Sequence, residues 1–354
     1  MGKKLLEVKD LHTSFFTANG EVKSVNGVSY YIDEHEIVAV VGESGCGKSV
    51  TQMSVMQLVQ SPPGKIKSGE VLLEDKNLLE YGPRSKEMQA VRGAQIAMIF
   101  QEPMTSLDPV YTVGNQLCEV IRKHRKCTKK EAWQIGVQAL ADVGIPDPES
   151  RMKNYPFEMS GGMRQRAMIA TAVACQSKLI ICDEPTTALD VTIQAKILEL
   201  IRSIQKERGI SVIYITHDLG VVAKVADYVD VMYAGKIVET GTIDEIFYEP
   251  RHPYTWGLLS AMPDLDTADD RLYTIPGSPP NLLHEKPGDA FAPRNHFALN
   301  IDDEVDPPMF KITDTHYAAT WLLDPRAPKV EMPPELAQRI SRMKADAEKI
   351  KEAE

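Results

Sequence analysis

The chain has 354 residues, enough for two or three structural units, and its 43% hydrophobic and 25% charged residues are typical of a globular protein. No apolar run approaches the roughly 18 residues of a membrane span, and a formal net charge of −10 argues against a general nucleic-acid binder. The five cysteines contain no Cys-x-x-Cys pair, and Lys3 precedes any long apolar stretch. We therefore expect a cytosolic protein without disulfides, a zinc site or a secretory signal.

Up to about residue 250, short apolar runs alternate with longer helical segments. Four runs are too short and too β-branched for helices and are predicted as buried strands, at residues 37–41, 96–100, 179–182 and 212–215. Between the second and third, Thr128 and Glu131 have the spacing of a capping box, and Gly144 and Pro146 end the helix that it starts. Buried strands joined by crossovers predict an α/β fold with a mainly parallel sheet covered by helices.

A glycine-rich segment follows the first of these strands directly. Residues 42–49 read GESGCGKS and match the pattern GxxxxGK[ST] between a strand and a helix. The glycines let the backbone N–H groups point at phosphate oxygens, and the following helix adds its positive end. Lys48 is expected to reach the β- and γ-phosphates, and the Ser49 hydroxyl to coordinate Mg²⁺. The sequence therefore predicts a nucleotide site formed by Gly42, Glu43, Ser44, Gly45, Cys46, Gly47, Lys48 and Ser49.

Two further motifs narrow the class of nucleotide-binding protein. The apolar run at 179–182 ends in Asp183, which can hold Mg²⁺ through water, and Glu184, which can polarise an attacking water. Residues 159–166 read MSGGMRQR, in which Ser160 is a good helix N-cap and Gly161 and Gly162 expose backbone N–H groups. This segment is a second anion-binding helix terminus in the same chain.

Together these motifs resemble those of ABC-type ATPases, over residues 5–245. The resemblance implies an ATPase with the P-loop NTPase fold in residues 1–250, with an inserted helical subdomain at about 104–175. It also implies that two subunits pair head to tail, so that the segment beginning at Ser160 completes the ATP site of the other subunit. ATP and Mg²⁺ are the expected substrate and metal.

The resemblance also implies roles for residues that spacing alone does not single out. Gln101 matches the glutamine that contacts Mg²⁺ and the attacking water, and His217 matches the switch histidine at the γ-phosphate. Asp190 matches the acidic residue of the loop across the dimer interface. Phe15 is expected to stack on adenine, with Phe16 as the alternative. Residues 102–109 resemble the segment that faces the transmembrane partner.

The Pro-rich extension at residues 251–354 narrows the family. It contains RHPYT at 251–255, IPGSPPNLL at 275–283 and FAPR at 291–294, and it ends in a Lys- and Glu-rich segment from Glu335 that is predicted as a solvated helix. With SGGMRQR, these segments are similar to one of the two unlike ATPases of oligopeptide and dipeptide importers.

That similarity implies a peripheral subunit at the cytoplasmic face of the cell membrane. Its implied partners are a second, unlike ATPase, two transmembrane permease subunits and, indirectly, an extracellular peptide-binding protein, with no nucleic acid. Oligopeptide import is the favoured function, with a dipeptide, nickel or other solute importer as the alternative. A soluble ABC ATPase without a membrane partner is disfavoured, because the chain has one P-loop, one signature and no extended heptads.

The extension departs from the family in one respect. Many members carry four cysteines there, which hold an iron–sulfur cluster, whereas no cysteine follows Cys182 in this chain. The matching positions are Asp289, Asn295, Asp302 and Thr320. Since such a cluster needs thiolates, we predict no iron–sulfur cluster. We expect the extension to be ordered by packing of Phe291, Phe297, Tyr317, Trp321 and Leu322.

Overall fold

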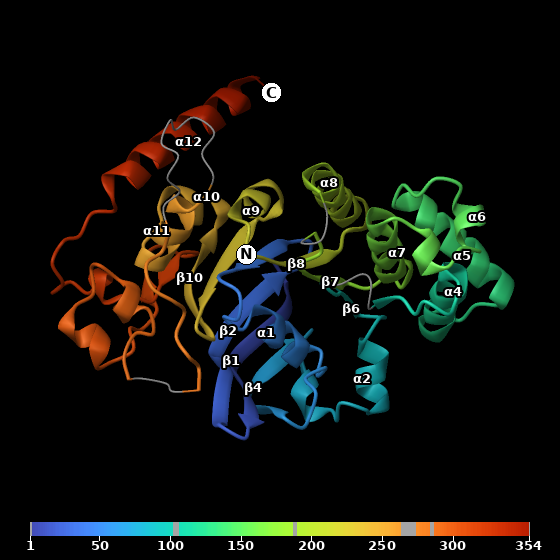
Figure 1. Ribbon diagram of the computed structural model, residues 1–354, viewed down its shortest axis with the longest axis horizontal. Coiled ribbons are helices and arrows are strands. Elements are labelled where there is room, and N and C mark those ends of the chain that lie inside the picture. The colour runs from blue at the N-terminus through green and yellow to red at the C-terminus, as the bar shows by residue number, and fades with distance from the viewer. Residues whose placement is uncertain (1, 102–105, 187–189, 263–273, 284–286, 354) are drawn as a thin grey trace.

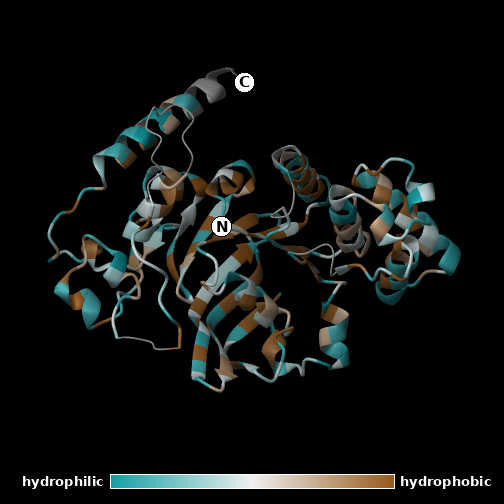
Figure 2. Ribbon diagram, viewed as in Figure 1, coloured by the Kyte–Doolittle hydropathy of each residue, from teal (hydrophilic) through white to brown (hydrophobic). Residues whose placement is uncertain are grey.

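The computed structural model describes residues 2–101, 106–186, 190–262, 274–283 and 287–353. A central body contains the sheets, a lobe of helices from α4 (Val113–His124) to α7 (Gly161–Ala174) lies on its right in Figure 1, and the C-terminal extension lies on its left. Figure 2 shows that hydrophobic residues concentrate in the central strands, whereas the terminal helix is mostly hydrophilic. Among the described residues, no helix combines the length and apolar character that a membrane crossing needs.

The larger sheet has a parallel centre, in the strand order β9-β3-β8-β7-β6. These strands are buried almost throughout, as their continuous apolar runs require. Because the strands are parallel, the segments that follow them emerge at one edge of the sheet. The parallel sheet expected from the sequence is confirmed, with the bounds β3 (Ile37–Val41), β6 (Ile96–Ile99), β7 (Leu179–Asp183), β8 (Ser211–Thr216) and β9 (Tyr228–Tyr233).

Beyond β9, the remaining strands of this sheet pair antiparallel, and the last two belong to the C-terminal extension. Strand β10 (Lys236–Thr242) pairs with β9, and β12 (Tyr317–Ala318) then pairs with β10. The outermost described strand, β11 (Phe310–Lys311), pairs with β12. The extension therefore continues the sheet to which the GESGCGKS segment is attached.

A second, antiparallel sheet has the order β2-β1-β4-β5 and was not anticipated from the sequence. Register shifts within β1 interrupt its pairing with both neighbours, so apolar residues do not alternate regularly along it. Helix α1 (Lys48–Val55) packs against β1 and β2. Leu6, Ile32 and Val71 of this sheet share a hydrophobic cluster with Val40 and Ile213 of the parallel sheet. The strands are β1 (Lys4–Thr17), β2 (Gly20–Asp33), β4 (Gly64–Leu73) and β5 (Lys76–Asn77), and the short helix α2 (Lys86–Val91) follows them.

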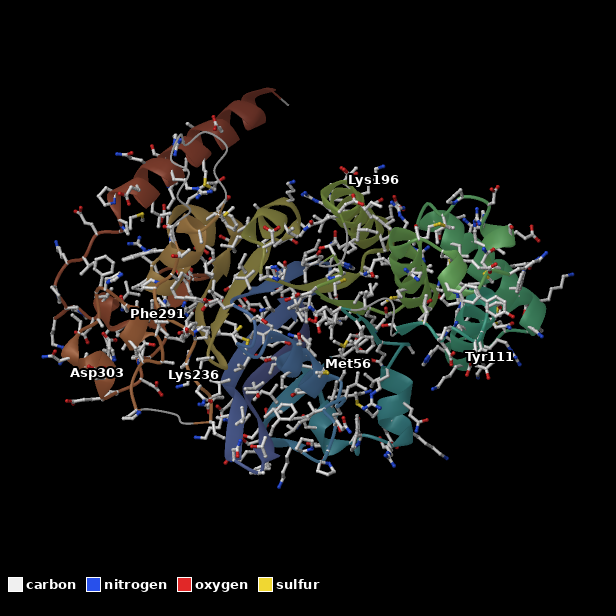
Figure 3. The ribbon with its side chains drawn as sticks, in the orientation of Figure 1. Met56, Tyr111, Lys196, Lys236, Phe291 and Asp303 are labelled. Atoms are coloured by element: carbon white, nitrogen blue, oxygen red, sulfur yellow. The ribbon has the colours of Figure 1, made fainter. Side chains whose placement is uncertain are left out.

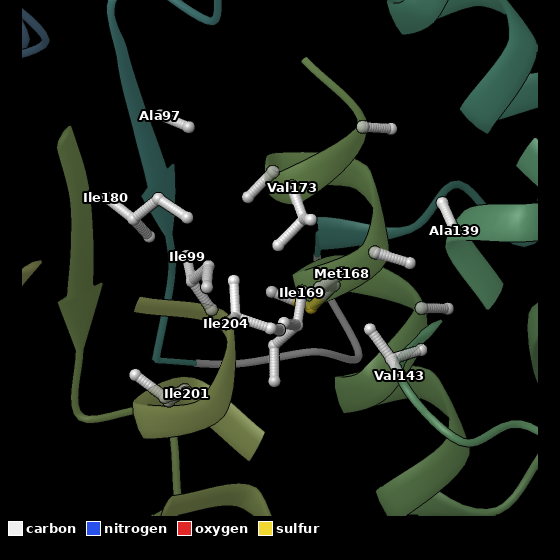
Figure 4. Close-up of a cluster of buried hydrophobic side chains, with 14 of the residues drawn as sticks. Ala97, Ile99, Ala139, Val143, Met168, Ile169, Val173, Ile180, Ile201 and Ile204 are labelled. Atoms are coloured by element: carbon white, nitrogen blue, oxygen red, sulfur yellow. The ribbon is translucent and has the colours of Figure 1, made fainter. Parts of the chain in front are cut away.

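The helical lobe consists of α4 (Val113–His124), α5 (Lys129–Asp142), α6 (Pro148–Arg151) and α7 (Gly161–Ala174). The capping box predicted at the start of α5 is confirmed, because the Glu131 N–H donates to Thr128 Oγ1 and the Thr128 N–H donates to the Glu131 carboxylate at 2.7 Å. Figure 4 shows how α7 and α8 (Val191–Arg208) cover the parallel strands, with Ile169, Val173 and Ile204 in one buried cluster with Ile99. The lobe thus shares one core with the sheet.

The C-terminal part packs on the opposite end of the parallel sheet. Tyr254, Trp256 and Phe291 are buried in one cluster with residues of β3 and β9, and Phe297 packs edge-on to Trp256. The terminal helix is confirmed but is not wholly solvated, since Leu336 and Ile340 on one face are buried. The helices α9 (Leu219–Val225) and α10 (Ile243–Tyr248) precede the extension, which contains α11 (Pro253–Ser260) and α12 (Pro334–Ala353).

Candidate functional site

The GESGCGKS segment forms a loop between β3 and α1, called the phosphate loop below. Gly42 and Gly47 both have positive φ angles, of 151° and 106°. A Cβ on Gly42 would lie 2.1 Å from the Met232 carbonyl oxygen, and one on Gly47 would lie 2.3 Å from the Ser24 carbonyl oxygen. Only glycine therefore fits where the loop runs against its neighbours. The resulting backbone curl is the one that suits phosphate oxygens.

Lys48 is folded back into this loop. Its side chain is buried, and its Nζ donates to the carbonyl oxygens of Gly42 at 2.8 Å and Glu43 at 3.0 Å. These two carbonyls hold the ammonium directly inside the loop. An anion that enters the loop meets this charge together with the N-terminus of α1.

Ser49 and Asp183 form a pair of oxygen donors beside the loop. The Ser49 hydroxyl donates to Asp183 Oδ1 at 2.8 Å, and burial raises the pKa of the Asp183 carboxyl. Among the described residues, no group of three His, Cys, Asp or Glu side chains could hold a metal by itself. Mg²⁺ in nucleotide sites uses one or two protein oxygens together with phosphates and water, so this hydroxyl and carboxylate fit that metal.

Three side chains from neighbouring strand ends meet at one point. Gln101 follows β6, Glu184 follows β7 and His217 follows β8, and these strands are parallel neighbours. The Gln101 amide Nε2 donates to Glu184 Oε2 at 2.9 Å, and His217 Nδ1 lies 3.4 Å from Glu184 Oε1. Glu184 has a φ of 44°, a strained conformation for a residue with a side chain, and its N–H donates to Ile215 at 3.0 Å. The carboxylate is thus fixed where it can accept a proton from water.

The SGG segment lies apart from the phosphate loop of its own chain. Ser160 Oγ accepts from the Met163 N–H, which caps α7 as predicted, and α7 belongs to the helical lobe (Figure 1). Gly162 is closely packed, because a Cβ there would lie 3.1 Å from the Ile193 side chain. Asp190 is exposed and caps α8 by accepting from the Ile193 N–H at 2.9 Å. An interface role of Gly161, Gly162 and Asp190 stays a prediction.

The choice between Phe15 and Phe16 also stays open. Phe15 is half-buried near Gly64, whose added Cβ would lie 3.0 Å from the Phe15 ring. Phe16 has 48% of its surface exposed at the end of β1. Of the segment expected to face a transmembrane partner, residues 102–105 lie outside the described residues.

Two residues of the extension reach the phosphate loop and were not singled out from the sequence. The Glu43 N–H donates to the Tyr254 hydroxyl at 2.8 Å, and Arg294 donates to both oxygens of the Glu43 carboxylate. They stand 211 and 251 positions away along the chain. Their only sequence signal was that they lie in the RHPYT and FAPR segments.

The four positions that match the family's cysteines form local caps instead. Each side chain accepts a hydrogen bond from a backbone N–H two or three residues away: Asp289 from Phe291, Asn295 from Phe297, Asp302 from Leu299 and Thr320 from Leu322. Burial raises the pKa of Asp289 to about 6. Carboxylate, amide and hydroxyl oxygens do not fit an iron–sulfur cluster, which binds through thiolates.

Comparison with known proteins agrees with this geometry. A family model described as "ABC transporter" matches residues 25–187, and one described as "Oligopeptide/dipeptide transporter, C-terminal region" matches residues 238–301. Among solved structures, cbiO1 from Clostridium perfringens, part of the ABC transporter complex cbiONQ, has a TM-score of 0.59 at 27% identity over 70% of this chain and 92% of that chain. The dimeric ATP-binding cassette MJ0796 bound to ADP and Pi has a TM-score of 0.60 at 24% identity, over 67% of this chain and 98% of its own. The fold and the site define an ABC-type ATP-binding cassette.

The curated relatives narrow the family. The chain is 56% identical to the oligopeptide transport ATP-binding protein OppD of Bacillus subtilis, over 98% of this chain and 96% of that protein. It is 52% identical to the dipeptide transport ATP-binding protein DppD of Lactococcus lactis subsp. cremoris, over 93% of each. The chain belongs to the family of ATP-binding proteins of oligopeptide and dipeptide ABC transporters, and the resemblance noted from the sequence is confirmed.

Proposed function

We propose that this chain binds and hydrolyses ATP with Mg²⁺ and thereby powers import of oligopeptides through a membrane ABC transporter. The observation that carries the proposal is the identity of 56% with OppD along nearly the whole chain, including the extension. The side chains assembled at the strand ends support it. Dipeptide import is the second candidate, because DppD is nearly as similar at 52%.

The proposed mechanism assigns each strand-end residue one task. The phosphate-loop N–H groups and Lys48 stabilise charge on the phosphate oxygens. Glu184 polarises the attacking water, while Gln101 orients the carboxylate and His217 lies beside it. Mg²⁺, when bound, neutralises charge on the β- and γ-phosphates, and Ser49 and Asp183 are the residues that would hold it.

A second ATPase subunit completes the site in this proposal. Ser160 is exposed at the start of α7, and α7 lies apart from the phosphate loop, which precedes α1 in the same chain (Figure 1). In a head-to-tail pair, the N–H groups of Gly161 and Gly162 would face the ATP bound by the other subunit. We propose an unlike partner, as the sequence resemblance implies. We also propose that the extension holds no iron–sulfur cluster, since its side chains at those positions serve as caps.

The permease subunits would dock on an apolar patch of the helical lobe. The patch consists of exposed side chains on the segments that flank α4 and α6: Val110, Tyr111, Tyr155 and Phe157. Figure 3 shows Tyr111 at the surface of the lobe, and the rings of Tyr155 and Phe157 stack at 5.5 Å. A hydrogen bond of 2.9 Å from the Val113 N–H to Asn154 joins the two segments. An exposed apolar surface of this kind favours a protein partner. Docking of the permease subunits here would hold the chain at the cytoplasmic face of the membrane, as we propose.

The patch is tested by copurification with the permease pair. Phe157→Ser and Tyr111→Ser should lose the permeases and keep ATP binding, because neither residue belongs to the phosphate loop. Val305→Ser removes an exposed apolar side chain of the extension and serves as the matched control. Full copurification of both patch variants would rule out this docking surface.

The catalytic assignment is tested by two substitutions. Lys48→Ala should weaken binding of ATP, because it removes the only side-chain cation proposed inside the loop. Glu184→Gln should leave ATP binding intact and lower hydrolysis by about 10²–10⁴-fold. Glu149→Gln, on the exposed surface of α6, is the matched control and should behave as the native chain. Normal turnover in Glu184→Gln would refute the role of that carboxylate.

The cargo is tested by uptake of labelled di-, tri- and longer peptides in cells without other peptide importers, carrying the native chain or Glu184→Gln. Loss of longer-peptide uptake with dipeptides unaffected supports oligopeptide import. Loss of dipeptide uptake alone supports the second candidate. Unchanged uptake of every peptide would contradict both candidates.

A further inference from the structure

We propose that the C-terminal extension holds the phosphate loop in its nucleotide-binding shape through Arg294 and Tyr254, which are therefore positioning residues of the ATP site. The inference rests on the proposed function in one respect, since it takes the phosphate loop as the nucleotide site. It goes beyond that function because it gives the extension a direct part in nucleotide affinity.

Glu43 is the residue of the loop through which the extension acts. Its carboxylate accepts two hydrogen bonds from Arg294, from Nη1 at 2.6 Å and from Nη2 at 2.9 Å. Its N–H donates to the Tyr254 hydroxyl at 2.8 Å, and its carbonyl accepts from Lys48 Nζ at 3.0 Å. One residue thus joins the ammonium that is proposed to bind phosphate to two groups of the extension.

The Arg294 guanidinium and the Tyr254 hydroxyl are held rigidly by their neighbours. The Arg294 side chain is only 4% exposed, and it also donates from Nε to the Pro276 carbonyl at 2.7 Å and from Nη1 to the Tyr233 hydroxyl at 3.2 Å. The Tyr254 ring is fully buried, and its centroid lies 4.6 Å from that of Tyr233 and 5.3 Å from that of Phe291. Figure 3 shows Phe291 in the extension, beside the central body. Neither group can turn away without repacking this aromatic cluster.

The contacts of Glu43 with Tyr254 and Arg294 of the extension fix the backbone of the phosphate loop. The Glu43 N–H donates to the Tyr254 hydroxyl and its carbonyl accepts from Lys48 Nζ, so both main-chain groups of this residue are held by hydrogen bonds. A loop of this kind that is ordered before the ligand arrives does not lose conformational freedom on binding. A loop released from the extension has to be ordered by the nucleotide itself. Releasing the loop from the extension should therefore raise the Kd and KM for ATP more than it lowers kcat.

The test measures binding of a fluorescent ATP analogue with Mg²⁺ to the full chain. Arg294→Gln leaves the Glu43 carboxylate without its fork of donors and should raise the Kd roughly tenfold, the scale of one charge-assisted hydrogen bond. Arg294→Lys keeps the charge without the fork and should give a smaller rise. Glu43→Gln should resemble Arg294→Gln, and the double variant should be no weaker than either single variant, because the two act through one contact.

A matched control removes a similar pair elsewhere in the extension. Arg326 donates from Nε and Nη2 to Asp324 at 2.8 Å each, on the surface and away from the phosphate loop. Arg326→Gln should leave the Kd unchanged. Tyr254→Phe removes only the hydroxyl that accepts from Glu43, so it keeps the proposal testable if Arg294→Gln does not fold; it should raise the Kd severalfold.

The outcomes separate this inference from the proposed function. A native Kd in Tyr254→Phe and Arg294→Lys, together with a lowered melting temperature, would mean that these contacts stabilise the fold alone and would overturn the inference. Equal and additive effects of Glu43→Gln and Arg294→Gln would overturn it as well. If Lys48→Ala bound the analogue as tightly as the native chain, the nucleotide site itself would be misassigned. Weak binding in Lys48→Ala with the changes expected above supports both.

Discussion

Asp230 is a buried carboxyl group whose titration tests how burial affects the stability of this fold. It lies on β9, opposite Val40 of β3 and Thr240 of β10, and it is 1% exposed. Thr240 Oγ1 donates to Asp230 Oδ1 at 2.5 Å, and Asp230 Oδ2 has no hydrogen-bond partner among the described residues. Burial raises the pKa of this carboxyl to about 7, which the Thr240 hydroxyl only partly offsets.

The raised pKa makes the free energy of unfolding depend on pH. Below pH ~4 the carboxyl is protonated in both the folded and the unfolded chain, so it carries no penalty. Between pH ~4 and about 7 the unfolded chain releases this proton while the folded chain keeps it, so stability falls as the pH rises. Three pH units at about 1.4 kcal/mol each give a penalty of about 4 kcal/mol above pH 7, as an upper value.

Asp230→Asn removes the titrating group and retains an oxygen for Thr240. Its stabilisation should be about 1.4 kcal/mol at pH 5, one pH unit above ~4, and should approach the full penalty at pH 8. The measurement is urea unfolding followed by fluorescence at both pH values, with Asp314→Asn on the exposed surface as a control expected to change little. An equal shift of the unfolding midpoint at pH 5 and pH 8, or a destabilisation at pH 8, would refute this account of Asp230.

Three further substitutions test other parts of the fold. Gly42→Ala should abolish ATP binding, measured by titration, because its Cβ would lie 2.1 Å from the Met232 carbonyl oxygen and the loop must move; native affinity would contradict the packing described. Thr128→Ala should lower the stability of α5 by about 1 kcal/mol in urea unfolding without changing ATP affinity, since it removes the cap shared with Glu131. Phe291→Ala should cost about 3–5 kcal/mol in the same assay, and a loss below 1 kcal/mol would mean that the aromatic cluster can collapse around the cavity.

The sequence was most informative where one local rule sets the structure. The four predicted parallel strands are short runs of apolar and β-branched residues, and each is found within a residue or two of its expected place. The capping box at Thr128 and the N-cap at Ser160 follow from residue types at fixed spacing. The strand-end residues Gln101, Glu184 and His217 come together because the ends of parallel strands share an edge.

Long-range contacts could not be found in this way. Nothing local to Glu43 indicates that its carboxylate pairs with Arg294, because the pairing depends on how the extension folds back. The antiparallel sheet was missed since register shifts in β1 obscure the alternation that marks a half-buried strand. The buried face of α12 could not be predicted from the sequence, because the two buried apolar residues, Leu336 and Ile340, stand among many charged ones.

The pairing of β12 with β10 predicts how a chain that lacks the extension would behave. A protein cut after residue 250 would leave β10 as an open sheet edge, with main-chain groups free to pair with another chain. It would also uncover the apolar side chains of the cluster around Tyr233. Such a fragment should self-associate, and the intact chain should melt in a single transition, because the cassette and the extension lack separate hydrophobic interiors at their junction.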